Sequence, residues 1–387
     1  MVGWWIPDAR CGIGARSRLA GMVLLWLGLG AFLPTSEARA QDVRVTGTVG
    51  DTPVDLTITG WQVFAPGTPA GAPVPVSARP RPPLPKITGP VMFNTPEADR
   101  ILEAMQVFPP DNPWNEDISQ LPVHPNNANL LASTDPDHWL WFNLDMCFIL
   151  VPPDQKRVPL KLVSYAGESD PGPYPVPDNA PIEGWPLYGA DLDRVQREGE
   201  GDRHCLVVDP VKAMLYEFFV IRKTDEGWQA ACEASFDLKS NQLRPDGWTS
   251  ADAAGLPIFP AVVRYDECER GMVEHAMRVT FSRTRREYAY PATHFASRSD
   301  DPNLPGMGYR LRLKRDFDTT GFAPHVQAIL KGMKKYGMFV ADNGMNWLIS
   351  IAPDTRLKGL EELKRLKGTD FEFVQTTGPN EGPRARP

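Results

Sequence analysis

Apolar and polar residues alternate along much of the chain, and this pattern predicts β-strands. Residues 43–64 alternate around a Gly-Asp pair, which predicts a small hairpin. Residues 338–341 and 347–351 flank an Asp-Asn-Gly turn and predict a second hairpin. Further strands are expected at residues 146–151, 160–165, 204–208, 215–223, 262–265, 273–281, 286–290 and 371–374.

Helical patterns are fewer. Thr95 and Pro96 are typical of a helix start and predict a short helix over residues 95–105. Residues 322–336 predict another, which Gly337 ends. Four leucines at every third position predict a helix that buries one leucine face; they are Leu357, Leu360, Leu363 and Leu366. The order of elements predicts a mainly β protein, with a β-sandwich or jelly-roll core and a small C-terminal α/β elaboration.

The amino-acid composition indicates how the chain divides into domains. The 40 prolines in 387 residues are roughly twice the usual ~5 % share, and proline disfavours a mostly helical protein. Residues 65–86 predict a stiff Pro-rich linker between the short β element at 41–64 and a main domain at 87–375. Residues 376–387 predict a disordered tail. A long loop-rich stretch, residues 108–192, is expected to cover the strand core and to carry function.

The first forty residues resemble an export signal. Arg10, Arg16 and Arg18 precede an apolar run at residues 19–33, and Ala38-Arg39-Ala40 follows. This order is typical of a cleaved signal peptide at 1–40, whereas a spanning helix needs ~20 apolar residues. An uncleaved N-terminal anchor is the alternative. We therefore expect a secreted or periplasmic protein that is not inserted in a membrane after cleavage.

Charge and cysteine content agree with export. The chain has a formal net charge of −7, and the expected signal removes four arginines and two acids, so the exported chain is more acidic still. Such a chain lacks the basic surface expected for nucleic-acid binding. Four cysteines remain after the signal, and in an oxidising compartment they predict two disulfides with three open pairings. They are Cys147, Cys205, Cys232 and Cys268.

The predicted hairpin at residues 204–223 offers a candidate acid–base pair. If its loop holds an even number of residues, Val208 faces Leu215, and His204 lies diagonal to Glu217 on one face. Desolvation on a half-apolar face raises the pKa of a carboxyl group towards neutrality, as acid–base catalysis requires. The alternative is a buried polar pair with a structural role.

Residues 273–294 hold further candidates. Alternation places His275 on the core face, and Glu274 and Arg278 on the other face, which is either the polar lining of a concave sheet or a solvated surface. Tyr290 and His294 follow at a strand end, and these residue types serve as base and acid in polysaccharide lyases, where Arg278 or Arg264 would neutralise a uronate carboxylate. A strand end with a satisfied histidine is the alternative.

Aromatic residues suggest a sugar partner. Exposed rings beside Asp and Asn suit sugar rings, so Trp114, Trp185, Trp248 and Tyr174 are candidate substrate-binding residues. Tryptophan packing beneath Pro-rich loops is an equally ordinary alternative. No cofactor is predicted. A divalent metal held by His204, Glu217, His275 and His294 is an alternative without a spaced signature. Asp342-Asn343-Gly344 is explained as a turn.

Several specific segments carry a resemblance. Residues 244–278, YPATH at 290–294 and YGMFVADNG at 336–344 resemble a family of secreted bacterial proteins usually described as hypothetical. The resemblance covers most of residues 90–375. It implies no activity, so it assigns no functional residue.

These patterns lead to one main hypothesis. We expect a carbohydrate-active enzyme that cleaves glycosidic bonds of an extracellular polysaccharide, as a hydrolase or a lyase, by carboxylate and histidine acid–base catalysis. The candidate catalytic residues are His204, Glu217, Glu274, Arg278, Tyr290 and His294. The alternatives are a non-catalytic glycan-binding or cell-envelope protein and a metal-dependent enzyme.

Overall fold

The computed structural model describes residues 43–49, 52–58, 80–186 and 191–379. The chain divides into two units, residues 1–70 and 71–387, so the division falls inside the predicted linker at 65–86. In the first unit, β1 (Val43–Val49) pairs antiparallel with β2 (Thr52–Ile58), which confirms the predicted hairpin. Its Gly-Asp turn, the expected signal peptide and most of the linker lie outside the described residues.

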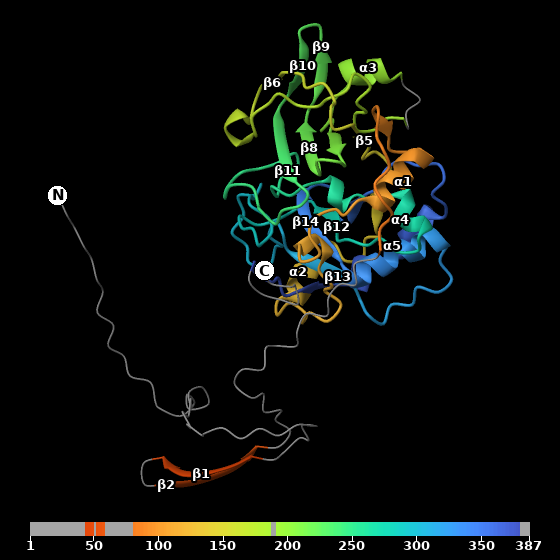
Figure 1. Cartoon of the computed structure of the whole chain (residues 1–387). Helices are drawn as coiled ribbons and strands as arrows, with labels where there is room; N and C mark the ends of the chain where they lie inside the picture. The colour runs from red at the N-terminus through yellow and green to blue at the C-terminus, as the bar shows by residue number, and fades with distance from the viewer. Residues whose placement is uncertain (1–42, 50–51, 59–79, 187–190, 380–387) are drawn as a thin grey trace, which may run out of the picture. The chain divides into compact units, whose positions relative to one another are not determined.

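The second unit contains three sheets, each mixing parallel and antiparallel pairs. The small sheet has the order β6 (Leu160–Leu162), β10 (Gly227–Ala230), β9 (Arg222–Thr224). The five-stranded sheet has the order β11 (Cys232–Asp237), β8 (Met214–Phe219), β7 (Cys205–Asp209), β5 (Phe148–Leu150), β3 (Val91–Met92). The six-stranded sheet has the order β16 (Phe371–Val374), β13 (Arg310–Leu313), β14 (Met338–Asn343), β12 (Met277–Phe281), β15 (Leu348–Ser350), β4 (Trp141–Asn143). Figure 1 shows the first two sheets in the upper half of this unit and the third below them.

Short helices surround the sheets. The α-helices are α1 (Pro96–Ala104), α2 (Asn127–Ala132), α3 (Leu192–Arg197), α4 (Tyr265–Glu269) and α5 (Pro324–Lys335). The 3₁₀ helices are η1 (Pro113–Asn115), η2 (Ala166–Glu168), η3 (Phe259–Ala261), η4 (Leu360–Arg365) and η5 (Gly368–Asp370).

The main helix predictions are confirmed. Thr95 caps α1 by accepting a hydrogen bond from the Ala98 N–H at 3.2 Å, and Gly337 follows α5 with a φ of +68°. The leucine-rich segment forms η4 rather than an α-helix. A 3₁₀ helix has three residues per turn, so leucines at every third position all face the core, and all four are buried.

The five-stranded sheet is buried on both faces. Tyr216 and Phe218 pack towards the small sheet, whereas Leu206 and Leu215 face the core shared with the six-stranded sheet. The register pairs Val208 with Leu215 and Leu206 with Glu217, as the sequence predicted. Glu217 therefore points into the larger core, between the two big sheets.

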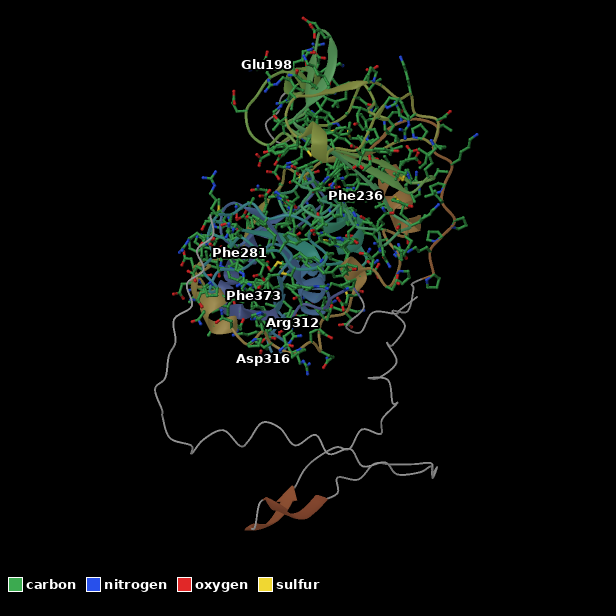
Figure 2. The ribbon with its side chains drawn as sticks, turned by 90° about the vertical axis from the view of Figure 1, so that its left-hand side faces the viewer. Glu198, Phe236, Phe281, Arg312, Asp316 and Phe373 are labelled. Carbon is green, nitrogen blue, oxygen red and sulfur yellow. The ribbon has the colours of Figure 1, made fainter. Side chains whose placement is uncertain are left out.

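The six-stranded sheet builds the other side of that core. The rings of Phe281 and Phe373 lie 6.2 Å apart between their centroids, and Figure 2 shows both among the side chains of this half. The same view shows Asp316 at the edge of this half and Glu198, just after α3, at the opposite end of the unit.

Some strand predictions in this half are wrong. β12 lies between β14 and β15, so residues 338–351 do not form a hairpin. Residues 262–265 contribute one bridge, from Val263 to Ile351, before α4 begins, and residues 286–290 contribute one bridge, from Tyr288 to Met307. Alternation shows which residues are buried, but long-range pairing decides whether they join a ladder.

The predicted disulfides do not form in the structure. Cys147, Cys205, Cys232 and Cys268 are all free and buried. Burial raises the pKa of the Cys205 thiol to about 12 and that of Cys232 to about 11. These neutral thiols pack as small apolar side chains.

The end of the chain is partly ordered. The predicted tail began at residue 376, but the Thr377 hydroxyl hydrogen-bonds the Glu116 carboxylate at 3.2 Å. Residues 380–387 lie outside the described part of the chain. Across the described residues, no helix has the length and apolar character needed to cross a membrane.

Candidate active site

Six charged or titratable side chains, from loops and from the six-stranded sheet, interact electrostatically; we call them the charged cluster. They are Asp145, Glu183, His204, Asp252, Arg278 and Asp342. Asp145 lies between β4 and β5, His204 just before β7, Arg278 on β12 and Asp342 on β14. Loops supply the other two. The cluster therefore depends on both sheets being folded and packed together.

Glu183 and His204 form a closely bonded pair. Glu183 Oε2 accepts hydrogen bonds from His204 Nδ1 at 2.8 Å and from the His204 backbone N–H at 3.1 Å. His204 Nε2 lies 2.9 Å from the Ala251 carbonyl oxygen, which can only accept. Both ring nitrogens therefore donate, so the imidazole carries a positive charge.

His204 and Glu183 shift each other's pKa values in opposite directions. Burial lowers the pKa of His204, but the charge and hydrogen bond of Glu183 outweigh it and raise the pKa to about 9. Burial likewise raises the pKa of Glu183, but His204 and its hydrogen bonds lower it to about 2. Glu183 is ionised across the whole neutral range.

Asp145 lies beside this pair, and its pKa is shifted in the direction opposite to that of Glu183. The Gly184 N–H donates to the Asp145 carbonyl oxygen at 2.9 Å, which brings the two loops together. Burial and the negative charge of Glu183 raise the pKa of Asp145 to about 7. Its Oδ1 is buried and has no hydrogen-bond partner among the described residues. The pKa values of these two neighbouring carboxyl groups thus differ widely, so Asp145 can carry a proton near neutral pH while Glu183 is ionised.

Arg278 connects the remaining members. Its Nε and Nη2 donate to the two Asp252 oxygens at 2.9 and 2.6 Å, and its Nη1 donates to Ser350 Oγ at 2.9 Å. Asp342 Oδ2 lies 3.9 Å from Nη2. Burial and the charge of Asp252 raise the pKa of Asp342 to about 7. Asp342 thus belongs to the cluster, and the sequence interpretation of this residue as part of a turn was incomplete.

Glu217 is buried among backbone groups instead of facing His204. Its carboxylate accepts from the Ile258 N–H at 2.8 and 2.9 Å and from the Phe259 N–H at 2.7 Å. Burial raises its pKa to about 7, as the sequence argument expected. Its contacts show an anchor for residues 258–259.

The other predicted catalytic residues divide into two groups. His204, Glu217, Arg278 and His294 all contact the segment 251–259; His294 Nδ1 bonds the Ala253 carbonyl at 2.7 Å. Glu274 lies 3.9 Å from Arg270 Nη2, and Tyr290 lines a small cavity with Arg310. The structure therefore brings four of the six to one segment and places Glu274 and Tyr290 elsewhere. His275 is a core histidine, as predicted, bonded to Glu267 at 2.9 Å.

Two of the predicted sugar-binding rings are core residues. Trp114 is buried against Phe339, with ring centroids 4.9 Å apart, and Tyr174 is buried against Phe218. Both interpretations as exposed platforms were wrong, because the Pro-rich loops carry these rings inward. Trp185 is half-buried against Phe93 directly after Gly184.

Trp248 is half-buried beneath Arg244, whose guanidinium lies 5.5 Å from the ring centroid. Its ring is thus covered on one side by a cation.

The histidines do not gather into a metal site. His204 and His275 each have both ring nitrogens hydrogen-bonded to protein groups. Within the ranges the structure describes, no group of three or more His, Cys, Asp or Glu side chains could hold a metal ion.

Sequence reasoning missed Asp145 and Glu183. Neither belongs to a spaced motif, and 37 other residues separate them along the chain. The available signal was weak. Asp145 follows Trp141 by four residues and Glu183 precedes Trp185 by two, both within the loop-rich stretch 108–192 where function was expected. Their proximity follows from loop packing, which no local pattern encodes.

An apolar depression of the surface lies apart from the charged cluster. That depression, of about 350 Å³, is lined by residues such as Leu84, Met105, Phe108 and Leu238 and by no member of the cluster. In the comparisons with known proteins, no family model, no curated protein and no solved structure matched the chain. The charged cluster is therefore the feature of the chain that points to a function.

Proposed function

We propose that this protein is a carbohydrate-active enzyme that hydrolyses glycosidic bonds of an extracellular polysaccharide at Asp145 and Glu183. The supporting observation is that these neighbouring carboxyl groups are held at widely different pKa values, about 7 for Asp145 and about 2 for Glu183. Glycoside hydrolysis uses such a pair, one carboxyl group as proton donor and the other as an anion. His204 positions Glu183 and keeps it ionised.

The proposed reaction balances with these two groups. Protonated Asp145 gives its proton to the leaving glycosidic oxygen as the bond to the anomeric carbon breaks. Ionised Glu183 stabilises the positive charge that develops on the sugar ring. The Asp145 carboxylate then takes a proton from the attacking water, whose oxygen bonds to the anomeric carbon, and the starting state returns.

The contacts favour a hydrolase over a lyase. A lyase needs a cation free to neutralise a uronate carboxylate, and Arg278 or Arg264 was the expected cation. Arg264 is buried, and its Nη2 lies 2.8 Å from Glu267 Oε1. Arg278 is bonded at both Nε and Nη2 to Asp252 and is almost completely buried. Its charge therefore holds the cluster together.

The location and architecture of the protein complete the proposal. We infer from the sequence that the chain is secreted or periplasmic. We further propose that the five-stranded and six-stranded sheets form a sandwich-like core. Its parallel pairs, such as β5 with β7 and β12 with β14, distinguish it from an antiparallel jelly roll.

A polysaccharide panel tests the proposal. The purified protein is incubated with xylan, carboxymethylcellulose, laminarin, polygalacturonate and alginate, and both reducing ends and absorbance near 235 nm are followed. A hydrolase releases reducing ends without the absorbance of an unsaturated product, whereas a lyase produces both. Asp145→Asn removes the proton donor at nearly constant shape, and Asp154→Asn, at an exposed position outside the cluster, is the matched control. Reducing-end release that is equal in wild type and Asp145→Asn would contradict the proposal.

A further inference from the structure

Three aromatic rings, one exposed and two half-buried, lie tilted against one another at the beginning of β4; we call them the aromatic platform. They are His138, Trp139 and Trp141, whose ring centroids lie 5.4, 5.7 and 6.1 Å apart. Trp139 is 44 % exposed, among the most exposed large apolar side chains of the described residues. A cluster of this kind on a surface marks a binding site more often than a single exposed ring does.

Polar contacts fix the orientation of these rings. The Trp141 Nε1–H donates to His138 Nε2 at 3.3 Å, and His138 Nδ1 donates to the Trp139 carbonyl oxygen at 3.0 Å. A neutral His138 with its proton on Nδ1 satisfies both bonds. The Lys364 ammonium lies 5.0 Å from the Trp141 ring centroid. The rings are therefore held in place before any ligand arrives, which reduces the entropy cost of binding.

The surroundings of the platform suit a sugar chain. Two exposed aspartates, Asp135 and Asp137, directly precede it in the chain, and the exposed Lys367 pairs with Trp139 in an antiparallel bridge. Sugars present C–H faces that stack on aromatic rings and hydroxyl groups that hydrogen-bond at the edges. A protein partner would instead favour an apolar surround with a polar rim farther out.

β4 connects the platform to the charged cluster. Trp141 is the first residue of β4, which forms an edge of the six-stranded sheet, and Asp145 follows two residues after its end. Four residues of extended chain span at most about 13 Å. A polymer lying along this edge reaches from the platform to the proposed proton donor.

We propose that the aromatic platform is a remote binding subsite for a polysaccharide chain whose glycosidic bond lies at Asp145 and Glu183. The inference rests on the proposed function for the direction of the chain, but the binding itself can be measured without cleavage. A remote subsite holds long substrates and contributes nothing to short ones.

Affinity electrophoresis in gels containing xylan, hydroxyethylcellulose, laminarin or alginate tests the subsite. We expect Trp139→Ala to weaken the retardation of the protein by the bound polymer about tenfold. Tyr165→Ala removes an aromatic side chain of similar exposure, 46 %, outside the platform and is the matched control; it should migrate like wild type. Equal retardation of wild type and Trp139→Ala, or no retardation of wild type by any polymer, would overturn the proposal. So would a difference in oligomeric state between wild type and Trp139→Ala, measured by sedimentation, that accounts for the difference in retardation.

Cleavage assays separate this inference from the proposed function. If Asp145→Asn abolishes cleavage while Trp139→Ala binds and cleaves polymers like wild type, the platform proposal fails and the hydrolase proposal stands. If wild type cleaves nothing but loses retardation on Trp139→Ala, the platform stands and the hydrolase proposal fails. If both stand, Trp139→Ala raises the KM for polymers and leaves the cleavage of short oligosaccharides unchanged.

Discussion

Replacement of Asp145 by asparagine should make the protein more stable at alkaline pH while abolishing its activity. The carboxyl group ordinarily loses its proton near pH 3.8 but in the folded protein has a pKa of about 7. The folded state therefore keeps a proton that the unfolded state has lost, and stability falls as pH rises between these values. Asparagine has the same shape and does not titrate.

The structure gives the size of this effect. At about 1.4 kcal/mol per pKa unit, ionisation of Asp145 costs about 2–3 kcal/mol between pH 5 and pH 8. Glu217 and Asp342 also have raised pKa values, so the wild-type curve falls for several reasons. The informative quantity is the difference between Asp145→Asn and wild type at the two pH values.

Urea denaturation followed by tryptophan fluorescence measures that difference. The free energy of unfolding of Asp145→Asn, relative to wild type, should be about 2–3 kcal/mol higher at pH 8 than at pH 5. Asp154→Asn, at an exposed position outside the cluster and the platform, is the matched control and should show the same stability difference from wild type at both pH values. If the relative stability of Asp145→Asn is constant from pH 5 to pH 8, Asp145 is ionised in the folded protein and cannot be the proton donor.

Three further substitutions test other parts of the structure. Glu183→Gln should destabilise the protein by about 3–5 kcal/mol at pH 6, because it leaves the His204 charge buried without a partner. The pKa of His204 is raised to about 9 and that of Glu183 lowered to about 2. The pair therefore contributes its full stabilising free energy between about pH 4.5 and 6.5. The stability difference between Glu183→Gln and wild type in urea denaturation should shrink as pH rises through 9 or falls through 2. A difference that stays constant over this range would contradict the ionic pair. Glu217→Gln should lower the free energy of unfolding by about 1–2 kcal/mol, because it weakens the anchor at Ile258 and Phe259. Its kcat should stay within about threefold of wild type. A hundredfold loss of kcat would show that Glu217 is catalytic. Leu363→Ala, at a fully buried position, should cost about 2–5 kcal/mol in thermal unfolding, whereas Leu243→Ala, at a position that is 37 % exposed, should stay within about 0.5 kcal/mol.

Local patterns predicted what depends on neighbouring residues. Capping by Thr95, the end of α5 at Gly337 and the register of Val208 with Leu215 were all confirmed. Each follows from backbone geometry or from side-chain alternation within a few residues. The buried leucine face was also predicted, although its spacing of three produced a 3₁₀ helix.

The candidate site could be predicted only in part. His204 was identified because strand pairing placed it near a carboxyl group on a half-apolar face, and Arg278 because alternation placed it on the polar face of its strand. Both proved to be buried. Their partners were not. Glu183 and Asp252 lie in loops, where alternation carries no information about which side chain points inward.

The sequence by itself determined the sheet-rich class, most element positions and the burial of the alternating residues, since these depend on local geometry and on hydrophobic periodicity. Only the tertiary structure decided which carboxyl groups meet. Asp145, Glu183 and Asp342 come from distant segments, and their protonation depends on the burial and charges created when the two large sheets pack together. Packing likewise placed β12 between two strands that the sequence had joined as a hairpin. Long-range contacts of this kind form because the whole apolar surface is buried at once, so no segment of the chain specifies them alone.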